Sequence, residues 1–436
     1  MHGQKTLTQN ILALTWPAIA TNVTTPLLSL VDVAVVGHIG NSVFIGAIAV
    51  GATMFNTLYW LFGFLRMGTG GLTAQAYGAG DLGAVRKILC RAMTVAVVAA
   101  LLLIGLSSVS AGFFIDFFDA SGVLRVPARE YFCIAILGAP GVLITYVLSG
   151  WFLGMQDSRP ILWMALVTNG LNIVLNLVFV FVFRWQIEGV AAATAVSQWV
   201  GACFGAIILY GKWRKLCREE DGLVCESTFD IRFVRFFRVN ADIFLRTLCL
   251  IAVTVWFTHA GAQFGSEILA ANALIMQLFM LFSYFMDGFA YAGEALAGRF
   301  KGAGDMVSLR SLVRTLMRIG VWVSLIVTIV YLFGTDAILG LLTDDARTLA
   351  VAVDYKLWAV AVPFAGFMSF LWDGIFIGLT KTRAMLLSMA IAMVVFYVVY
   401  FMLMPMFGNH ALWLAFILYL FARGLVQTII YSLGKK

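Results

Sequence analysis

Long apolar runs, interrupted only by scattered polar residues, follow one another along the whole chain. A helix that spans a lipid bilayer uses roughly 20 predominantly apolar residues, and these runs reach or exceed that length. Short stretches rich in glycine, proline or charge separate them. The pattern predicts twelve spanning helices in two sets of six, at 9–36, 44–76, 84–112, 126–152, 160–183 and 188–212, then at 236–261, 267–299, 307–334, 347–376, 384–406 and 411–433.

The composition is that of a membrane protein. Hydrophobic residues make up 62% of the 436 positions and charged residues 12%, whereas a soluble domain has roughly half and a quarter. Because the sequence has no zinc-binding His-Glu-x-x-His helix and no Gly-x-Ser-x-Gly nucleophile turn, we expect no enzyme. The net charge of +7 comes from basic residues scattered among the connections, which argues against a nucleic-acid partner. The six cysteines form no Cys-x-x-Cys pair, so we expect neither a disulfide framework nor a metal site.

Basic residues are concentrated in alternate connections between the apolar segments. Arg86, Lys87 and Lys381 are examples, whereas the intervening connections carry acids such as Asp116. By the positive-inside rule the basic connections face the cytoplasm, which places both termini there. We therefore expect a multi-pass protein of a bacterial inner membrane. Its first apolar segment should be retained, because no signal-peptide cleavage site accompanies it.

The two sets of six segments are related by an internal repeat. The tetrapeptide Gly-Ala-Gly-Asp at 78–81 recurs 224 positions later at 302–305, and the same offset pairs Gly150 with Gly374. Since six is even, both halves enter the membrane in the same orientation, as parallel repeats around a central cleft. An all-α polytopic fold with two pseudo-symmetric six-helix lobes follows, and such repeats suit transport by alternating access. The predicted divisions are an N-terminal lobe, a cytoplasmic linker and a C-terminal lobe, at 1–212, 213–235 and 236–436.

Asp32 is the residue that we most expect to couple transport to an ion. It lies deep in the first apolar segment, where a charged carboxylate is unfavourable unless it is paired or wetted. Burial favours the neutral form of a carboxyl group, so Asp32 is a candidate proton carrier. Pro26, six residues earlier, removes a backbone hydrogen bond and predicts a helix bend. The alternative is that Asp32 is a structural hydrogen-bonding group near the outer helix end.

Neutral polar residues mark a second candidate site, in the N-terminal half. Asn172 and Asn176 are one helical turn apart on the fifth segment, so their amides share a face, and Asn169 precedes them. With Asp32 and Thr194 of the sixth segment they predict a polar pocket. Ordinary hydrogen bonding between helices is the alternative.

Acids at membrane depth mark a third candidate, in the C-terminal half. Asp287 and Glu294 project from similar faces of the eighth segment, and Asp373 lies in the tenth. These three residues are a possible coupling or substrate site. Asp242 and Arg246 are four residues apart in the seventh segment, which predicts a neutralising structural ion pair.

These features resemble the MATE (multidrug and toxic compound extrusion) family, and its DinF branch in particular. The resemblance rests on Pro26 and Asp32, both Gly-Ala-Gly-Asp loops, and the runs 240–246 and 286–295. It implies a V-shaped, two-lobed bundle that exports organic cations and other amphipathic compounds in exchange for inward protons or sodium ions. Asp32 matches the acid of the family's first helix.

Departures from the family pattern bear on the coupling ion. Members with a characterised cation pocket often have Asn-x-x-x-Asp on the fifth helix, whereas this chain has Asn172 and Asn176 at those positions. A hard cation prefers several oxygen ligands with compensating negative charge, so we expect a proton rather than sodium.

We therefore expect a secondary active multidrug antiporter that exchanges lipophilic or cationic small molecules for protons. We expect it to need no cofactor and to work as a monomer among membrane lipids. Two alternatives stay open: a sodium-coupled drug antiporter and a lipid-linked flippase of the same superfamily. The flippase is disfavoured because such proteins have a strongly cationic cavity, and Arg66 is nearly alone here as a candidate deep cation.

Overall fold

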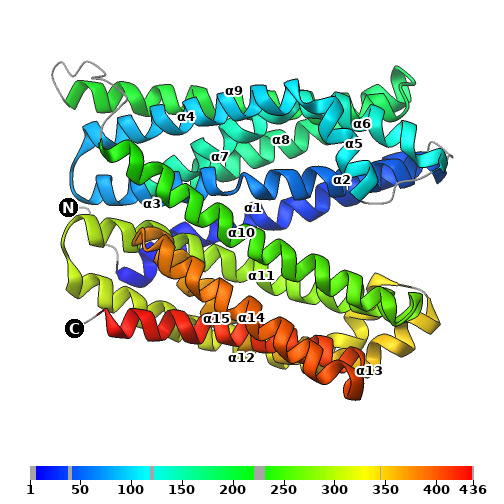
Figure 1. Ribbon diagram of the computed structural model, residues 1–436. Helices are drawn as coiled ribbons and strands as arrows, with labels where there is room; N and C mark the ends of the chain where they lie inside the picture. Colours follow the sequence, from blue (N-terminus) through cyan, green and yellow to red (C-terminus); the bar gives the residue numbers. More distant parts are fainter. Residues whose placement is uncertain (1–5, 38–41, 118–121, 220–230, 344, 435–436) are drawn as a thin grey trace. The chain divides into compact units, whose positions relative to one another are not determined.

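The computed structural model describes residues 6–37, 42–117, 122–219, 231–343 and 345–434, and every regular element in these ranges is a helix (Figure 1). Eleven helical stretches of the described residues are long and apolar enough to cross a membrane. The remaining predicted span, 9–36, coincides with α1 (Leu7–Gly37). The all-α, multi-pass fold is therefore confirmed. Side chains are not described at a few positions inside helices: 25–37, 42–45, 114, 117, 215–219, 231–233 and 235.

The two halves of the chain differ in how continuous their helices are. After α1, the first half contains α2 (Ser42–Leu61), α3 (Phe64–Gly78), α4 (Leu82–Gly105), α5 (Ser107–Phe117), η1 (Gly122–Leu124), α6 (Arg125–Ala135), η2 (Ile136–Gly138), α7 (Ala139–Gly154), α8 (Arg159–Leu177), η3 (Val178–Val182) and α9 (Ile187–Glu219). In the second half each predicted span is one uninterrupted helix: α10 (Ile231–Gln263), α11 (Ser266–Gly302), α12 (Met306–Leu342), α13 (Ala346–Gly378), α14 (Thr382–Phe407) and α15 (Asn409–Leu433).

Glycine or proline lies at several of the breaks in the first half. Pro140 lies in the first turn of α7, where its missing N–H needs no helical acceptor, and the short 3₁₀ turn η2 precedes it. Gly63 lies between α2 and α3 and Gly105 ends α4, in keeping with the low helix propensity of glycine. Pro363 lies inside α13 without interrupting it, so proline alone does not determine a break.

The helices form two compact units. One unit is Trp16–Asn240, and the other is Ala241–Lys436 together with the start of α1 as far as Thr15. Within the first, α3 packs against α7 and α8 against α9; within the second, α11 packs against α13 and α14 against α15. Most of the predicted linker, 213–235, lies outside the described residues or side chains.

The internal repeat is visible in the backbone of the two Gly-Ala-Gly-Asp loops. Gly80 and Gly304 both have a φ of +73°, a left-handed conformation that glycine adopts without strain. The following aspartates, Asp81 and Asp305, cap α4 and α12, where each accepts a hydrogen bond from the backbone N–H three residues later, at 2.8 and 2.9 Å. The same loop therefore joins corresponding helices in both halves.

A second pair of repeat positions sets a close helix contact. A Cβ atom at Gly150 of α7 would collide with the carbonyl oxygen of Arg66 on α3, and a Cβ atom at Gly374 of α13 would collide with that of Ala290 on α11. Arg66 and Ala290 are themselves 224 positions apart. Glycine at both sites lets the two helix backbones approach, as small residues do in membrane proteins.

Large apolar side chains remain exposed on the outer helix faces, as expected in lipid. Phe333 and Ile326 of α12 are 82% and 58% exposed. Such a surface would be an aggregation hazard in water, whereas lipid tails are as apolar as the side chains themselves. The buried cores are built around Phe132 in the first unit and around Phe396 and Trp413 in the second.

Candidate functional site

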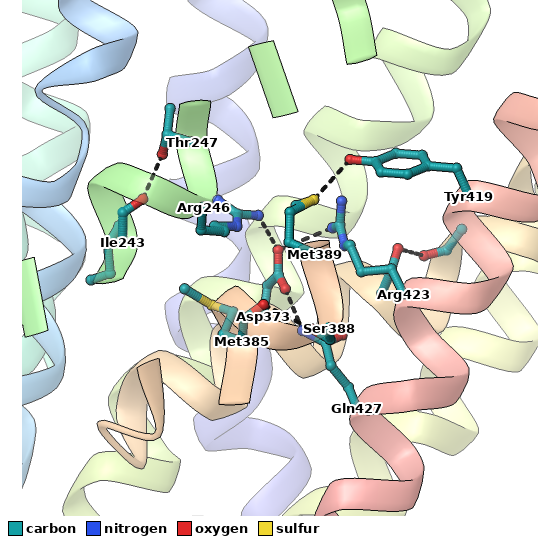
Figure 2. Close-up of polar contacts among 12 residues, drawn as sticks. Ile243, Arg246, Thr247, Asp373, Met385, Ser388, Met389, Tyr419, Arg423 and Gln427 are labelled. Carbon is teal, nitrogen blue, oxygen red and sulfur yellow. Dashed lines mark hydrogen bonds and ion pairs between the residues drawn. The ribbon is translucent and has the colours of Figure 1, made fainter. Parts of the chain in front are cut away.

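A buried carboxylate on α13 gathers three donors from two other helices (Figure 2). Asp373 Oδ2 accepts hydrogen bonds from Arg246 of α10 and, at 3.0 Å, from Arg423 of α15. Asp373 Oδ1 accepts a hydrogen bond from Gln427, one turn after Arg423, at 2.7 Å. These four residues, which we call the Asp373 cluster, join three helices that are each candidate membrane spans.

The Asp373 cluster is buried and carries more positive than negative charge. Asp373 is 7% exposed, Arg246 8%, Arg423 3% and Gln427 0%. Two guanidinium groups share one carboxylate, so the formal charge of the four residues is positive. A buried charge is unfavourable unless it is paired and hydrogen-bonded, which explains why both arginines turn toward Asp373.

Aromatic and sulfur-containing side chains border the Asp373 cluster. The guanidinium carbon of Arg423 lies 5.5 Å from the centre of the Phe370 ring, within cation–π range. Tyr419, one turn before Arg423, donates a hydrogen bond to Met389 Sδ at 3.1 Å. Asp287 of α11 adds a weaker electrostatic interaction with Arg423.

The ion pair predicted from sequence spacing, between Asp242 and Arg246, is different in the structure. Arg246 donates to Asp373 rather than to Asp242, and Asp242 instead accepts a hydrogen bond from Thr382 Oγ1 at 2.8 Å. The expected i, i+4 pair is therefore wrong. Both alternatives satisfy a buried charge, but only the observed one connects α10 to α13 and α15.

The other two acids of the predicted C-terminal site lie on a different helix from Asp373. Glu294 is buried at 1% exposure and Asp287 is half-buried, both on α11. The structure joins Asp373 of this predicted site to both buried arginines.

The predicted N-terminal pocket residues largely meet. Asn172 Nδ2 lies 3.3 Å from Thr194 Oγ1 and 3.4 Å from Ser197 Oγ, and Asn176 Nδ2 donates to Asn172 Oδ1 at 2.9 Å. Asn169 is half-buried and takes no part in these hydrogen bonds among the described side chains. All four connected groups are neutral, and Ser197 is an addition that the sequence analysis did not single out.

The remaining predicted residues lie where the structure describes only the helix. Pro26 and Asp32 belong to α1, but their side chains lie outside the described residues. In the part of the chain that the structure does describe, no three His, Cys, Asp or Glu side chains are grouped so that they could hold a metal ion.

Arg423 and Gln427 are the functional candidates that the sequence analysis missed. A signal for Arg423 exists, since it is a charge within the predicted apolar segment 411–433. The buried Arg423 and Arg246 also correct the expectation that Arg66 is nearly alone as a cation at membrane depth.

Comparison with known proteins identifies the family and the fold. The sequence model of the MatE family matches residues 17–178 and 242–402, one stretch in each half of the chain. The chain belongs to the MatE family. Members of this family are transporters, so the expectation of a transporter rather than an enzyme follows from this membership.

One relative of this MatE protein supports the predicted branch. DNA damage-inducible protein F of Escherichia coli (strain K12) is 37% identical over 95% of this chain and 90% of its own length, so the resemblance to the DinF branch is confirmed. The probable multidrug resistance protein NorM of Thermotoga maritima is 22% identical over 79% of this chain and 74% of its own length.

Solved structures agree with the fold of this MatE protein. A crystal structure of MATE in the bent conformation has a TM-score of 0.88 and 17% sequence identity, with coverage of 98% of this chain and 95% of that chain. An outward-facing multidrug resistance MATE transporter has a TM-score of 0.85 and 19% identity, with coverage of 98% and 96%. At this identity the likeness concerns the fold alone.

Proposed function

We propose that this MATE transporter is a secondary active exporter that moves lipophilic or cationic organic compounds outward in exchange for inward protons. Asp32 carries the proton, and Pro26 lets α1 bend when Asp32 changes its protonation state. The two units alternate access to the substrate. The protein works as a monomer in a bacterial inner membrane, in contact with its lipids and with both termini in the cytoplasm.

The absence of a free carboxylate from either described polar cluster carries the preference for protons. The hydrogen-bonded set of Asn172, Asn176, Thr194 and Ser197 is neutral. In the C-terminal unit, sodium would compete with two guanidinium groups for Asp373. Sodium needs several oxygen ligands with compensating negative charge, whereas a proton needs one carboxyl group, which Asp32 supplies.

The energy of one proton is sufficient for useful export. One charge that moves inward through 100 mV releases about 2.3 kcal/mol, and a factor of ten in concentration corresponds to about 1.4 kcal/mol. A single titrating carboxyl group can therefore maintain a substrate gradient of more than tenfold if the substrate carries no net charge.

The test is ethidium transport into everted membrane vesicles. Wild type and Asp32→Asn are compared under a pH gradient without sodium and under a sodium gradient without a pH difference. We expect pH-driven transport in the wild type and none in Asp32→Asn, with equal amounts of both proteins in the membrane. Full pH-driven transport by Asp32→Asn would refute the role of Asp32, and transport driven only by sodium would refute proton coupling.

A lipid-linked flippase is the second candidate function, because Arg246 and Arg423 are buried among candidate spans. Flippases of anionic lipids need deep cations, and these two arginines meet that requirement. Transport of a lipid-linked anion in liposomes, together with no ethidium transport under either gradient, would favour this candidate.

A further inference from the structure

We propose that Arg246 and Arg423 form a binding site for a single anionic group, a carboxylate, sulfonate or phosphate, on an amphipathic molecule. The inference goes beyond the proposed function because it adds an anionic class to the lipophilic and cationic compounds, and it rests on that function only in treating the ligand as cargo. Binding itself requires no gradient.

The Asp373 cluster has more hydrogen-bond donors than acceptors. Among the described residues, the Nε atoms of Arg246 and Arg423 are buried donors without a hydrogen-bond partner, and Gln427 Oε1 is one unpartnered acceptor beside them. Asp373 already accepts from both arginines and from Gln427. A buried donor without an acceptor is unfavourable, and the free-energy penalty is larger for a charged donor than for a neutral one. An additional anionic oxygen would therefore satisfy donors that the chain leaves unsatisfied.

The charge balance points to the same ligand. Two cations face one hydrogen-bonded carboxylate, and the half-buried Asp287 adds only a weaker interaction with Arg423. A monoanion beside Arg423 would give each guanidinium a counter-charge of its own. Arginine suits this role because its planar donors match carboxylate and phosphate oxygens.

Arg423 lies deep inside a candidate membrane span, where a charge without a role is energetically unfavourable. It lies fourteen residues after the start of α15 and ten before its end, about 21 and 15 Å at 1.5 Å per residue. Charges so far inside a span are rare and usually mark a ligand or ion pathway. The Phe370 ring lies beside Arg423, and the centre of the Phe279 ring is 6.2 Å from the centre of the Phe370 ring. These rings favour a ligand whose anionic group is attached to an apolar or aromatic body.

The carboxylate of the site has no counterpart at its repeat position in the first half of the chain. The repeat partner of Asp373, 224 positions earlier, is Ser149, which is buried on α7 and carries no charge. The polar cluster of the first half contains only amides and hydroxyls. The two hydrogen-bonded polar clusters therefore offer different chemistry, neutral groups in the first and a net positive charge in the second.

The test uses a matched pair of probes, hippurate, an aromatic carboxylate, and its neutral amide, hippuramide. Purified full-length protein in phosphatidylcholine nanodiscs is titrated with tritiated hippurate. We expect saturable binding that hippuramide does not displace. Arg423→Gln and Arg246→Gln should weaken binding by about tenfold or more, the loss of one charge-assisted hydrogen bond. Arg310→Gln, which removes an exposed arginine of α12, should bind as the wild type does.

The Asp373→Asn variant separates a binding role from a purely structural one. It removes the carboxylate that competes with the ligand for both arginines, so hippurate should bind more tightly than to the wild type. A folded Asp373→Asn protein that binds hippurate no more tightly would contradict the proposal. The amide oxygen that Asp373→Asn introduces can still accept a hydrogen bond from the arginines, so this variant should lose less stability than one without an acceptor at this position.

A second set of nanodiscs, with phosphatidylglycerol, identifies the source of the anion. Weaker hippurate binding by the wild type in these discs identifies a lipid phosphate as a competing occupant, and unchanged binding identifies soluble organic anions as the ligands. Both outcomes support an anion site. No saturable hippurate binding in phosphatidylcholine, together with no Arg423-dependent association of phosphatidylglycerol, would overturn it. Because binding is read without a gradient, its failure is distinct from a failure of proton-driven export.

Discussion

Removal of the Asp373 carboxylate should strongly destabilise the C-terminal unit. In Asp373→Ala, Arg246 and Arg423 lose the acceptor that they share, and both side chains are buried, at 8% and 3% exposure. Breaking a buried ion pair by removing one partner destabilises a protein by about 3–5 kcal/mol. Since two cations lose one counter-charge, we expect a loss near the upper end of this range.

A triple variant provides the matched comparison. Arg246→Met, Asp373→Leu and Arg423→Met together remove all three charges and leave no buried ion behind. Replacement of a whole buried ion cluster by apolar residues of similar size is often neutral, or stabilising by about 1–4 kcal/mol. The triple variant should therefore be at least as stable as the wild type, while it loses hippurate binding.

Thermal unfolding of the purified proteins in one detergent, followed by tryptophan fluorescence, measures both effects. We expect the apparent melting temperature to be lowest for Asp373→Ala and to return to the wild-type value or above it in the triple variant. Equal melting of Asp373→Ala and the wild type would refute the reasoning that this carboxylate neutralises the two buried arginines.

Three further predictions concern the scaffold. Asn272 and Asn409 exchange two amide hydrogen bonds at 2.8 and 2.9 Å in the buried core. Asn272→Leu should destabilise the protein by about 1–3 kcal/mol, and the addition of Asn409→Leu should restore part of the lost melting temperature. Strictly additive effects of the two substitutions would contradict the pairing. Gly374→Ala places a Cβ atom against the α11 backbone and should lower the yield of monodisperse protein. Gly170→Ala, whose Cβ atom meets open space, should leave that yield unchanged. Hydrogen bonds from Ser308 hold the pKa of Asp305 below its usual value of 3.8, so the contribution of Asp305 to stability is present above that pH and is lost as the pH falls through the lowered folded-state value. The difference in melting temperature between the wild type and Asp305→Ala should therefore shrink below pH 3.8. A difference that stays constant with pH would contradict this role of Asp305.

Most of the fold could be predicted from the sequence because the bilayer imposes a simple pattern. Apolar runs of spanning length identify the helices, and the 224-residue repeat of Gly-Ala-Gly-Asp identifies corresponding loops with the same backbone conformation. The breaks in the first half were not predicted. Pro140 lies in the first turn of a new helix, whereas Pro363 lies within one, so the presence of proline alone does not predict a break.

The candidate site was predictable only where its residues share a helix or have no competing partner. Asn172 and Asn176 are one turn apart, so their hydrogen bond follows from helical geometry. Arg246 had two possible acceptors, and its partner Asp373 is 127 residues away in the chain. Sequence spacing contains no information about such a choice, because it depends on which faces of α10, α13 and α15 meet.

Proton movement in proteoliposomes distinguishes proton-coupled export from sodium-coupled or uncoupled export. Vesicles that contain purified protein, ethidium and a pH-sensitive dye are diluted into sodium-free buffer without ethidium. We expect ethidium exit to acidify the vesicle interior with the wild type, and neither change to occur with Asp32→Asn. Ethidium exit without acidification, or exit that begins only when sodium is added outside, would contradict it.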